Sequence, residues 1–97
     1  MNKELMDNLF DVKGKVALIT GATGALGKAI AIGYGMAGMK VFVTGRKAEK
    51  NQALCEELRA QGIECASEAG DPAVESDVVK IVDACIAAFG EINVLYT

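Results

Sequence analysis

Histidine is absent from this sequence of 97 residues. Without it, a zinc site or a histidine-based proton relay within the chain is nearly excluded. Long apolar runs are absent as well, since none approaches the roughly 18 residues that a membrane-spanning helix needs. Positive charge is not clustered, because the ten Lys and Arg residues are scattered and the net charge is −3. This charge pattern argues against a nucleic acid or an anionic membrane as a partner.

Cysteine is scarce, and its three examples are Cys55, Cys65 and Cys85. An odd number at spacings that fit no metal motif predicts ordinary reduced thiols, as in a cytoplasmic protein. The segment from Met1 to Asp11 is polar and acidic and lacks the apolar region of a signal peptide. We therefore expect a cytoplasmic protein without a bound metal.

The chain is rich in aliphatic side chains, with 52% hydrophobic, 24% charged and 5% aromatic residues. This composition is typical of one small globular domain. Short apolar runs alternate with amphipathic stretches, as expected for strands and helices in turn. The expected strands are 16–20, 41–44, 63–67 and 92–96, and the expected helices are 26–37, 48–61 and 71–89.

This alternation predicts an α/β fold with right-handed crossovers between parallel strands. We expect a Rossmann-like doubly wound parallel sheet with strand order 3-2-1-4. The fourth strand would then lie at an edge, yet it is apolar and carries no Lys or Pro. We therefore expect the chain to be cut at its C-terminus. Inside the first helix, Gly33 and Gly35 predict close packing of helix on sheet rather than a hinge.

A glycine-rich turn follows the first strand, with Gly21, Gly24 and Gly27 at spacings of three. A buried strand, a tight turn and a helix N-terminus form a site for phosphate anions, because the first N–H groups of a helix have no partner inside it. Glycine also lets a pyrophosphate approach the backbone closely.

Two alternatives compete with a dinucleotide site at this turn. One is a magnesium-type phosphate loop, which the pair Gly27-Lys28 suggests. Five residues rather than four separate Gly21 from Gly27, and Ala29 stands where that loop needs a hydroxyl, so this alternative fails. The other is a tight turn that binds nothing.

The chain from Phe10 to Thr97 resembles the short-chain dehydrogenase/reductase family. The opening GKVALITGATGALG, from Gly14 to Gly27, is similar to that family's first strand and glycine turn. Gly70-Asp71 resembles its adenine-contacting aspartate, and FGEINVL, ending at Leu95, resembles the approach to its Asn-Asn-Ala-Gly segment.

The sequence departs from the family pattern at two places. Ala25 stands where the second glycine is usual, with Gly24 one position early, a spacing typical of the extended members. The lead-in and the FGEI segment are more similar to the compact members. Tyr96-Thr97 stands where the Asn-Asn-Ala-Gly segment should begin. The resemblance places the catalytic Asn, Ser and Tyr-x-x-x-Lys beyond residue 97, so the chain alone is expected to be inactive.

The resemblance implies an oxidoreductase that transfers hydride between NADP(H) and a carbonyl or secondary alcohol, with a sugar acid or 3-oxoacyl compound as the expected substrate. Residues 1–97 would be the N-terminal part of a single NAD(P)-binding Rossmann domain, without its catalytic part. The intact protein is expected to be a homo-oligomer, a dimer or a tetramer. The alternative is a non-catalytic nucleotide-binding or redox-sensing module. The pyrophosphate would be held by Gly21, Thr23, Gly24, Leu26 and Gly27.

The residues after the second strand favour NADP over NAD. An acidic residue there would bind the ribose 2′-hydroxyl of NAD, whereas Arg suits the 2′-phosphate of NADP. Here Arg46 and Lys47 follow Gly45, and Glu49 is the first carboxylate. Arg46 can hold the phosphate bidentately, with Lys47 adding charge. The alternative is a solvated Arg-Lys pair at the start of a surface helix.

Asp71 carries two interpretations that do not exclude each other. Spacing alone predicts a helix N-cap, because Asp caps well and Pro72 suits the first helical position. The resemblance adds a contact from Asp71 to the adenine amine.

Overall fold

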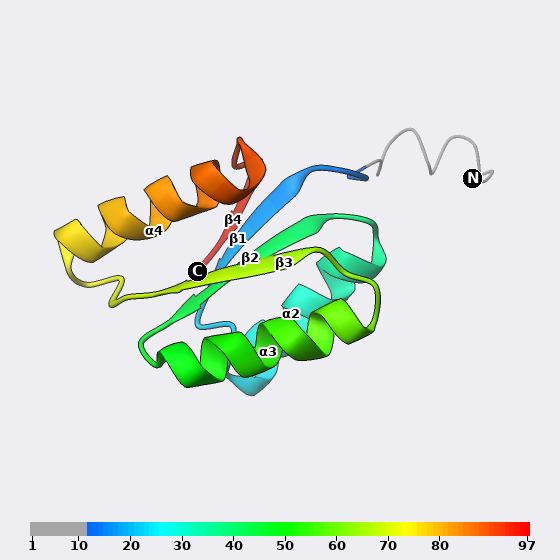
Figure 1. The fold of residues 1–97 in the computed structure, drawn as a ribbon, viewed down its shortest axis with the longest axis horizontal. Coiled ribbons are helices and arrows are strands. Elements are labelled where there is room, and N and C mark those ends of the chain that lie inside the picture. Colours follow the sequence, from blue (N-terminus) through cyan, green and yellow to red (C-terminus); the bar gives the residue numbers. More distant parts are fainter. Residues whose placement is uncertain (1–11) are drawn as a thin grey trace.

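The computed structural model describes residues 12–97, which form a parallel sheet with helices on both faces (Figure 1). The strands are β1 (Val16–Thr20), β2 (Lys40–Gly45), β3 (Cys65–Ala69) and β4 (Val94–Tyr96). The helices are α2 (Ala25–Met36), α3 (Ala48–Ala60) and α4 (Glu75–Phe89). The strand order β3-β2-β1-β4, with every pairing parallel, confirms the predicted topology.

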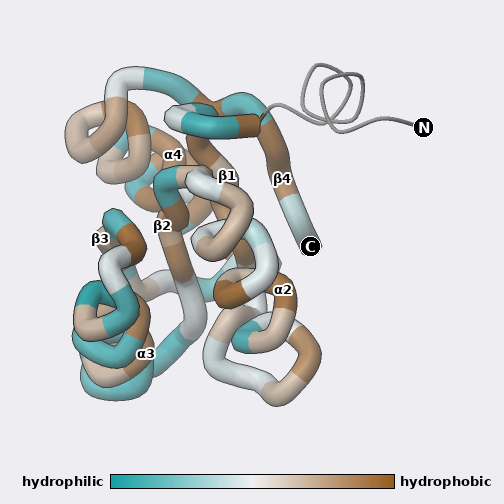
Figure 2. Tube along the Cα trace, turned by 90° about the vertical axis from the view of Figure 1, so that its right-hand side faces the viewer, coloured by the Kyte–Doolittle hydropathy of each residue, from teal (hydrophilic) through white to brown (hydrophobic). Residues whose placement is uncertain are grey.

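Alternate residues of the central strands face opposite layers. Ala17 and Ile19 of β1 belong to the core cluster beneath α2 and α3, whereas Val16 and Leu18 belong to the cluster beneath α4. A strand that is buried on both faces must be apolar throughout, as β1 is. Figure 2 shows this difference between elements: the central strands are hydrophobic, and α3 is hydrophilic over much of its length.

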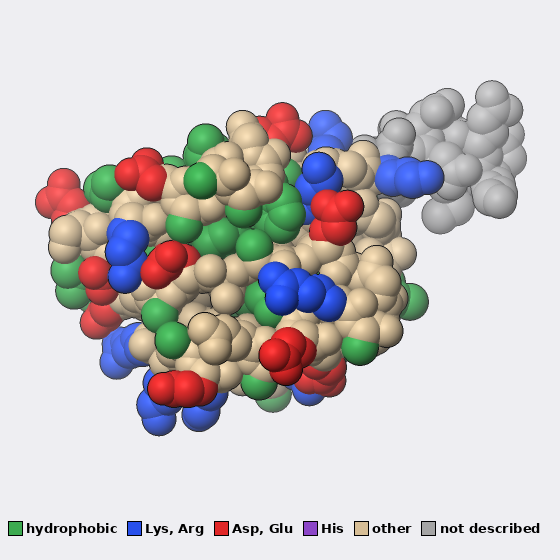
Figure 3. All heavy atoms as spheres, viewed as in Figure 1, with side chains coloured by type: hydrophobic (Ala, Val, Ile, Leu, Met, Phe, Trp, Pro, Cys, Tyr) green, Lys and Arg blue, Asp and Glu red, His purple; other side chains and the backbone are tan. Residues whose placement is uncertain are grey.

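The α4 layer rests on aromatic and aliphatic contacts. Phe42 of β2 and Phe89 of α4 meet edge to face, with ring centroids 6.5 Å apart. Ile81 and Cys85 of the same helix are buried against the sheet. Figure 3 shows the hydrophobic side chains that gather on this side of the molecule, between α4 and the sheet. The helix ends at Gly90, whose φ of 84° is the left-handed conformation that glycine adopts readily.

The predicted start of the last helix is wrong. Asp71 is not a helix N-cap, because α4 begins at Glu75 with Val74 at the cap position. The chain turns first: the Asp71 carboxylate accepts a hydrogen bond from Ala73 N (2.9 Å), and Val74 N donates to Asp71 O (3.0 Å). An aspartate whose side chain accepts a hydrogen bond from the backbone N–H two residues later forms an Asx-turn. Here the helix begins only after this turn.

The other boundaries differ by smaller amounts. The third strand lies at Cys65–Ala69 rather than 63–67, and the fourth is limited to Val94–Tyr96. Gly35 packs closely, but against Ile63 ahead of β3 rather than against a strand, since a Cβ there would lie 2.6 Å from Ile63 atoms. At Gly33 the predicted close packing is wrong, because nothing lies within 4 Å of a Cβ built there.

The segment that leads into β1 is described from Val12 onward. There Lys15 N donates to Val12 O (2.9 Å), which closes a turn ahead of the strand. Among residues 12–97, no helix is long and apolar enough to cross a membrane.

Candidate functional site

A pocket of about 390 Å³ opens where β1, β2 and β3 reach their carboxyl ends. In open parallel sheets this edge is where ligands bind, because the loops that follow neighbouring strands converge there. The walls come from the turn after β1, the end of β2 with the start of α3, and the loop after β3. The lining residues are Thr20, Gly21, Thr23, Thr44, Gly45, Arg46, Lys47, Lys50, Gly70 and Pro72.

The glycine turn at one side of the pocket is sterically constrained. Gly21 has a φ of 65°, a conformation that side-chain-bearing residues rarely adopt. Gly27 lies against the turn itself, so that a Cβ there would collide with the Gly21 carbonyl oxygen and lie 2.8 Å from Ala22 Cα. The first turn of α2 is thereby held tightly on the end of β1.

The N-terminus of α2 is left available to an anion. Gly24 occupies the cap position, and no described side chain caps the helix there. The first hydrogen bond of the helix is from Lys28 N to Gly24 O (2.9 Å), which leaves the N–H groups ahead of it without helical partners. No acidic residue lies in the first turn of α2 to compete with a bound anion.

Basic side chains line the opposite wall. Arg46 and Lys47 follow β2 directly, and Lys50 adds a third positive charge from the first turn of α3. No carboxylate contributes to the lining among the residues that the structure describes. The Arg46 side chain is 74% exposed, so it can reorient toward a ligand. The pocket therefore joins an anion-binding turn to a cationic wall.

Asp71 lies beside this pocket rather than in its wall. Its Oδ2 is 3.7 Å from Arg46 Nε, and the two residues share an adjoining cavity of about 330 Å³ with Asp77 and Lys80. Asp71 N donates to Asp77 Oδ2 (2.9 Å), which ties the loop after β3 to α4. Asp71 is thus held next to Arg46.

The predicted site residues differ in their position. Gly21, Thr23, Arg46 and Lys47 line the pocket. Gly24 and Gly27 belong to the glycine turn but do not line the pocket. Leu26 does not line it either, and its side chain is 67% exposed.

Lys28 does not take part in the pocket. Its Nζ is 2.9 Å from Glu57 Oε1 of α3, and it is absent from the lining. A phosphate loop of the magnesium type would need this lysine at the phosphates. The geometry therefore agrees with the sequence in excluding that alternative.

A sequence model of the short-chain dehydrogenase family matches residues 15–97. The chain belongs to the short-chain dehydrogenase family. The glycine turn, the cationic wall and the strand order all fall within the matched residues.

The relatives that this chain matches are longer proteins. The 2-dehydro-3-deoxy-D-gluconate 5-dehydrogenase of Formosa agariphila is 38% identical over 91% of this chain, but over 34% of its own length. A hydroxysteroid dehydrogenase structure from Escherichia coli superposes with a TM-score of 0.88 at 30% identity, over 98% of this chain and 38% of that one. The chain thus spans about a third of the proteins that it matches.

A matched structure of an actinorhodin polyketide ketoreductase variant contains NADPH. This chain is 34% identical to it and superposes with a TM-score of 0.81, over 84% of this chain and 31% of that one.

Two residues near the pocket are not evident from the sequence. Lys50 falls within the helix expected over 48–61, and nothing in its spacing sets it apart. Asn51 is 1% exposed, and its Nδ2 donates to Gly45 O (3.1 Å), which fixes the start of α3 to the end of β2. The available signal was a polar residue in step with Leu54 and Leu58 on the buried face of the helix. Asn51 Oδ1 has no hydrogen-bond partner among the described residues.

Proposed function

We propose that this chain is the cofactor-binding part of an NADP(H)-dependent oxidoreductase that interconverts a carbonyl and a secondary alcohol. The observation that carries the proposal is that Gly21 and Thr23, from the turn that leads into the uncapped N-terminus of α2, line the same pocket as Arg46, Lys47 and Lys50. A dinucleotide with an extra phosphate on its ribose presents charge at both of these places. When bound, NADP(H) supplies or accepts the hydride.

The residues of this chain would bind and orient the cofactor. The turn from Gly21 to Gly27 holds the pyrophosphate through backbone N–H groups, with Thr23, Gly24 and Leu26 as part of that turn. A side chain at Gly27 would fill the space that the turn occupies, so the fit depends on its being glycine.

The cationic wall would select the cofactor. Arg46 and Lys47 hold the 2′-phosphate, because a guanidinium binds phosphate bidentately and an ammonium adds point charge. Asp71 accepts a hydrogen bond from the adenine amine. Arg46 Nε lies 3.7 Å from Asp71 Oδ2, so the two side chains would meet neighbouring parts of the cofactor.

Cofactor choice can be tested by measuring NADPH and NADH affinity in the full-length protein. Arg46→Ala is expected to weaken NADPH binding about 10- to 100-fold, the value of a hydrogen bond to a charged group of about 1.5–3 kcal/mol. NADH affinity should change little. Lys40→Ala is the matched control, because it removes the same charge at the opposite end of β2. A wild-type preference for NADH would contradict the assignment of Arg46.

We further propose that residues 1–97 are the N-terminal part of one Rossmann domain, and that the catalytic residues lie outside them. The supporting fact is that the chain spans about a third of its relatives. Hydride transfer to small carbonyls can be assayed in the full-length protein, with sugar acids and 3-oxoacyl compounds as the first substrates. Tight NADPH binding without turnover of any of them would favour a non-catalytic nucleotide-binding module.

We also propose a cytoplasmic homo-oligomer, a dimer or a tetramer. Apolar side chains remain on the surface of α4, including Val79 (54% exposed) and Ile86 (44% exposed). Free buried cysteines suit a reducing compartment. Light scattering on the full-length protein measures the assembly, and a monomer would contradict it.

A further inference from the structure

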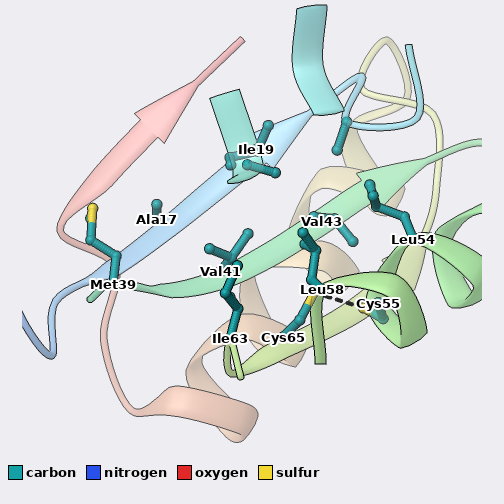
Figure 4. Packing of buried hydrophobic residues seen from close by; sticks show 12 residues of the cluster. Ala17, Ile19, Met39, Val41, Val43, Leu54, Cys55, Leu58, Ile63 and Cys65 are labelled. Carbon is teal, nitrogen blue, oxygen red and sulfur yellow. Dashed lines mark hydrogen bonds between the residues drawn. The ribbon is translucent and has the colours of Figure 1, made fainter. Parts of the chain in front are cut away.

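Two cysteine side chains meet inside the core, away from the cofactor pocket. Cys55 lies on the inner face of α3, Cys65 begins β3, and their sulfur atoms are 2.8 Å apart (Figure 4). The two elements pack directly on each other, so both sulfurs sit in the cluster that contains Leu58 and Val43. A disulfide bond is about 2.05 Å long, so bonding requires a shift of under roughly 1 Å.

The surroundings of the pair favour a reactive Cys55. The pKa of Cys55 is lowered to about 7, chiefly by the hydrogen bond from the Cys65 thiol. Burial acts in the other direction and raises this pKa, whereas Ser67 and Arg59 lower it further. The pKa of Cys65 is raised, because it serves as the hydrogen-bond donor and is buried. Arg59 is anchored here by two hydrogen bonds, from Nε (3.0 Å) and Nη2 (2.7 Å), to Cys65 O. Cys55 is thus the nucleophile of the pair, and Cys65 is the thiol that keeps its proton.

A cavity gives small molecules a route to this pair. Its volume is about 380 Å³, and it has no lining residue in common with the cofactor pocket. Cys55 forms part of its wall although the residue is only 1% exposed, which restricts access to small reagents. The remaining lining residues are Gln52, Glu56, Arg59, Ala66 and Ser67.

We propose that Cys55 and Cys65 are a reversible redox pair, which closes to a disulfide when hydrogen peroxide enters this cavity. The Cys55 thiolate attacks a peroxide oxygen, the O–O bond breaks, and hydroxide leaves and takes a proton to become water. Cys55 is then a sulfenic acid. The Cys65 sulfur attacks the Cys55 sulfur, the S–O bond breaks, and a second water leaves with the Cys65 proton. In total, the two thiols lose two electrons and two protons, which the peroxide gains. A dithiol then reduces the disulfide back to two thiols.

The geometry limits the disulfide to this pair. Cys85 is fully buried in the other core cluster, beneath α4, and burial raises the pKa of its thiol. A buried thiol in apolar surroundings reacts slowly. Cys85 is therefore an internal control for any oxidation caused by general unfolding.

The test treats the native full-length protein with hydrogen peroxide, blocks the remaining thiols and maps tryptic peptides by mass spectrometry. Trypsin separates the two cysteines into residues 51–59 and 60–80, and places Cys85 in the next peptide. The expected product is a cross-link between the first two peptides that dithiothreitol removes, while Cys85 stays unmodified. In Cys65→Ser, dimedone should trap a sulfenic acid on Cys55, and Cys85→Ser should cross-link as the wild type does.

Three outcomes would overturn the proposal. The first is oxidation of Cys85 as fast as Cys55. The second is conversion of Cys55 to sulfinic acid without a cross-link in the native protein. The third is no oxidation of Cys55 before the protein unfolds. The wild-type map alone decides among these, so the conclusion does not depend on the folding of a variant.

Discussion

Gly27 and Gly33 of α2 have different surroundings, although both are helical glycines. A Cβ at Gly27 would collide with the turn after β1, whereas nothing lies within 4 Å of Gly33. Gly27→Ala is expected to lower the free energy of unfolding by about 1–3 kcal/mol and to weaken NADPH binding. Gly33→Ala should raise stability by about 0.5–1 kcal/mol, because alanine loses less backbone entropy in a helix. Urea unfolding of the full-length variants measures both, and equal losses would contradict the steric argument.

The reactivity of Cys55 is expected to depend on pH. The thiolate is the nucleophile, and its pKa is lowered to about 7 by the Cys65 hydrogen bond, with Ser67 and Arg59 as further contributors. Glu56 and Arg59 are the charged residues of the described cavity wall. Because the thiolate forms as protons leave, the rate of peroxide oxidation should rise with pH and be half-maximal near 7. Peptide mapping at short reaction times measures this rate.

Two controls accompany the pH profile. Arg59→Gln removes the positive charge beside Cys55, so its midpoint should move to higher pH. Cys85 should show no reaction over the same range, because burial raises its pKa. A profile unchanged in Arg59→Gln would show that the arginine does not act on the thiolate.

At the scale of elements, Asn51 joins α3 to β2 through its bond to Gly45 O (3.1 Å). Asn51→Ala removes that bond and leaves a gap in a buried position, so we expect a loss of about 1–2 kcal/mol in the free energy of unfolding. Gln52→Ala is the matched control on the exposed neighbouring residue, and it should change stability by less than about 0.5 kcal/mol. Thermal or urea unfolding separates the two, and a negligible effect of Asn51→Ala would contradict the anchoring role.

Most elements could be predicted from the sequence because each has its own local pattern. The apolar runs and the glycines between them locate the strands and helices, and their alternation sets the strand order. The start of α4 could not be predicted in the same way. Asp71 and Pro72 have the residue types of a helix start, but the Asp71 side chain bonds Ala73 N and its backbone N–H bonds Asp77. These competing bonds depend on side-chain orientation, which periodicity does not encode.

The candidate site was predictable where it follows strand ends. Gly21 and Arg46 come directly after β1 and β2, and parallel strands bring such residues to one edge. Lys50 lies one turn into a helix, so only the packing of α3 brings it to the pocket. The contact between Cys55 and Cys65 likewise needs the distance between a helix and a strand, which no spacing in the sequence predicts.

At the scale of the whole molecule, cofactor binding should stabilise the fold. The pocket draws on the ends of β1 and β2, the loop after β3 and the start of α3, which separate when the protein unfolds. At a concentration of NADPH 100 times its Kd, we expect about 2.7 kcal/mol of added stability. Thermal unfolding with NADPH, with the same concentration of NADH as the comparison, measures this. An equal increase with both cofactors would argue against selection by the 2′-phosphate.

Strands β1 and β2 share a central place in the described fold, because each contributes to both core clusters and pairs with a strand on either side. The amide hydrogens of these strands can exchange with solvent only when both layers separate, so their opening approaches unfolding of the whole domain. The amides of Ala17 to Ile19 should therefore be among the slowest to take up deuterium. The glycine turn follows directly from one of these two central strands, which holds its N–H groups in place before any ligand is present.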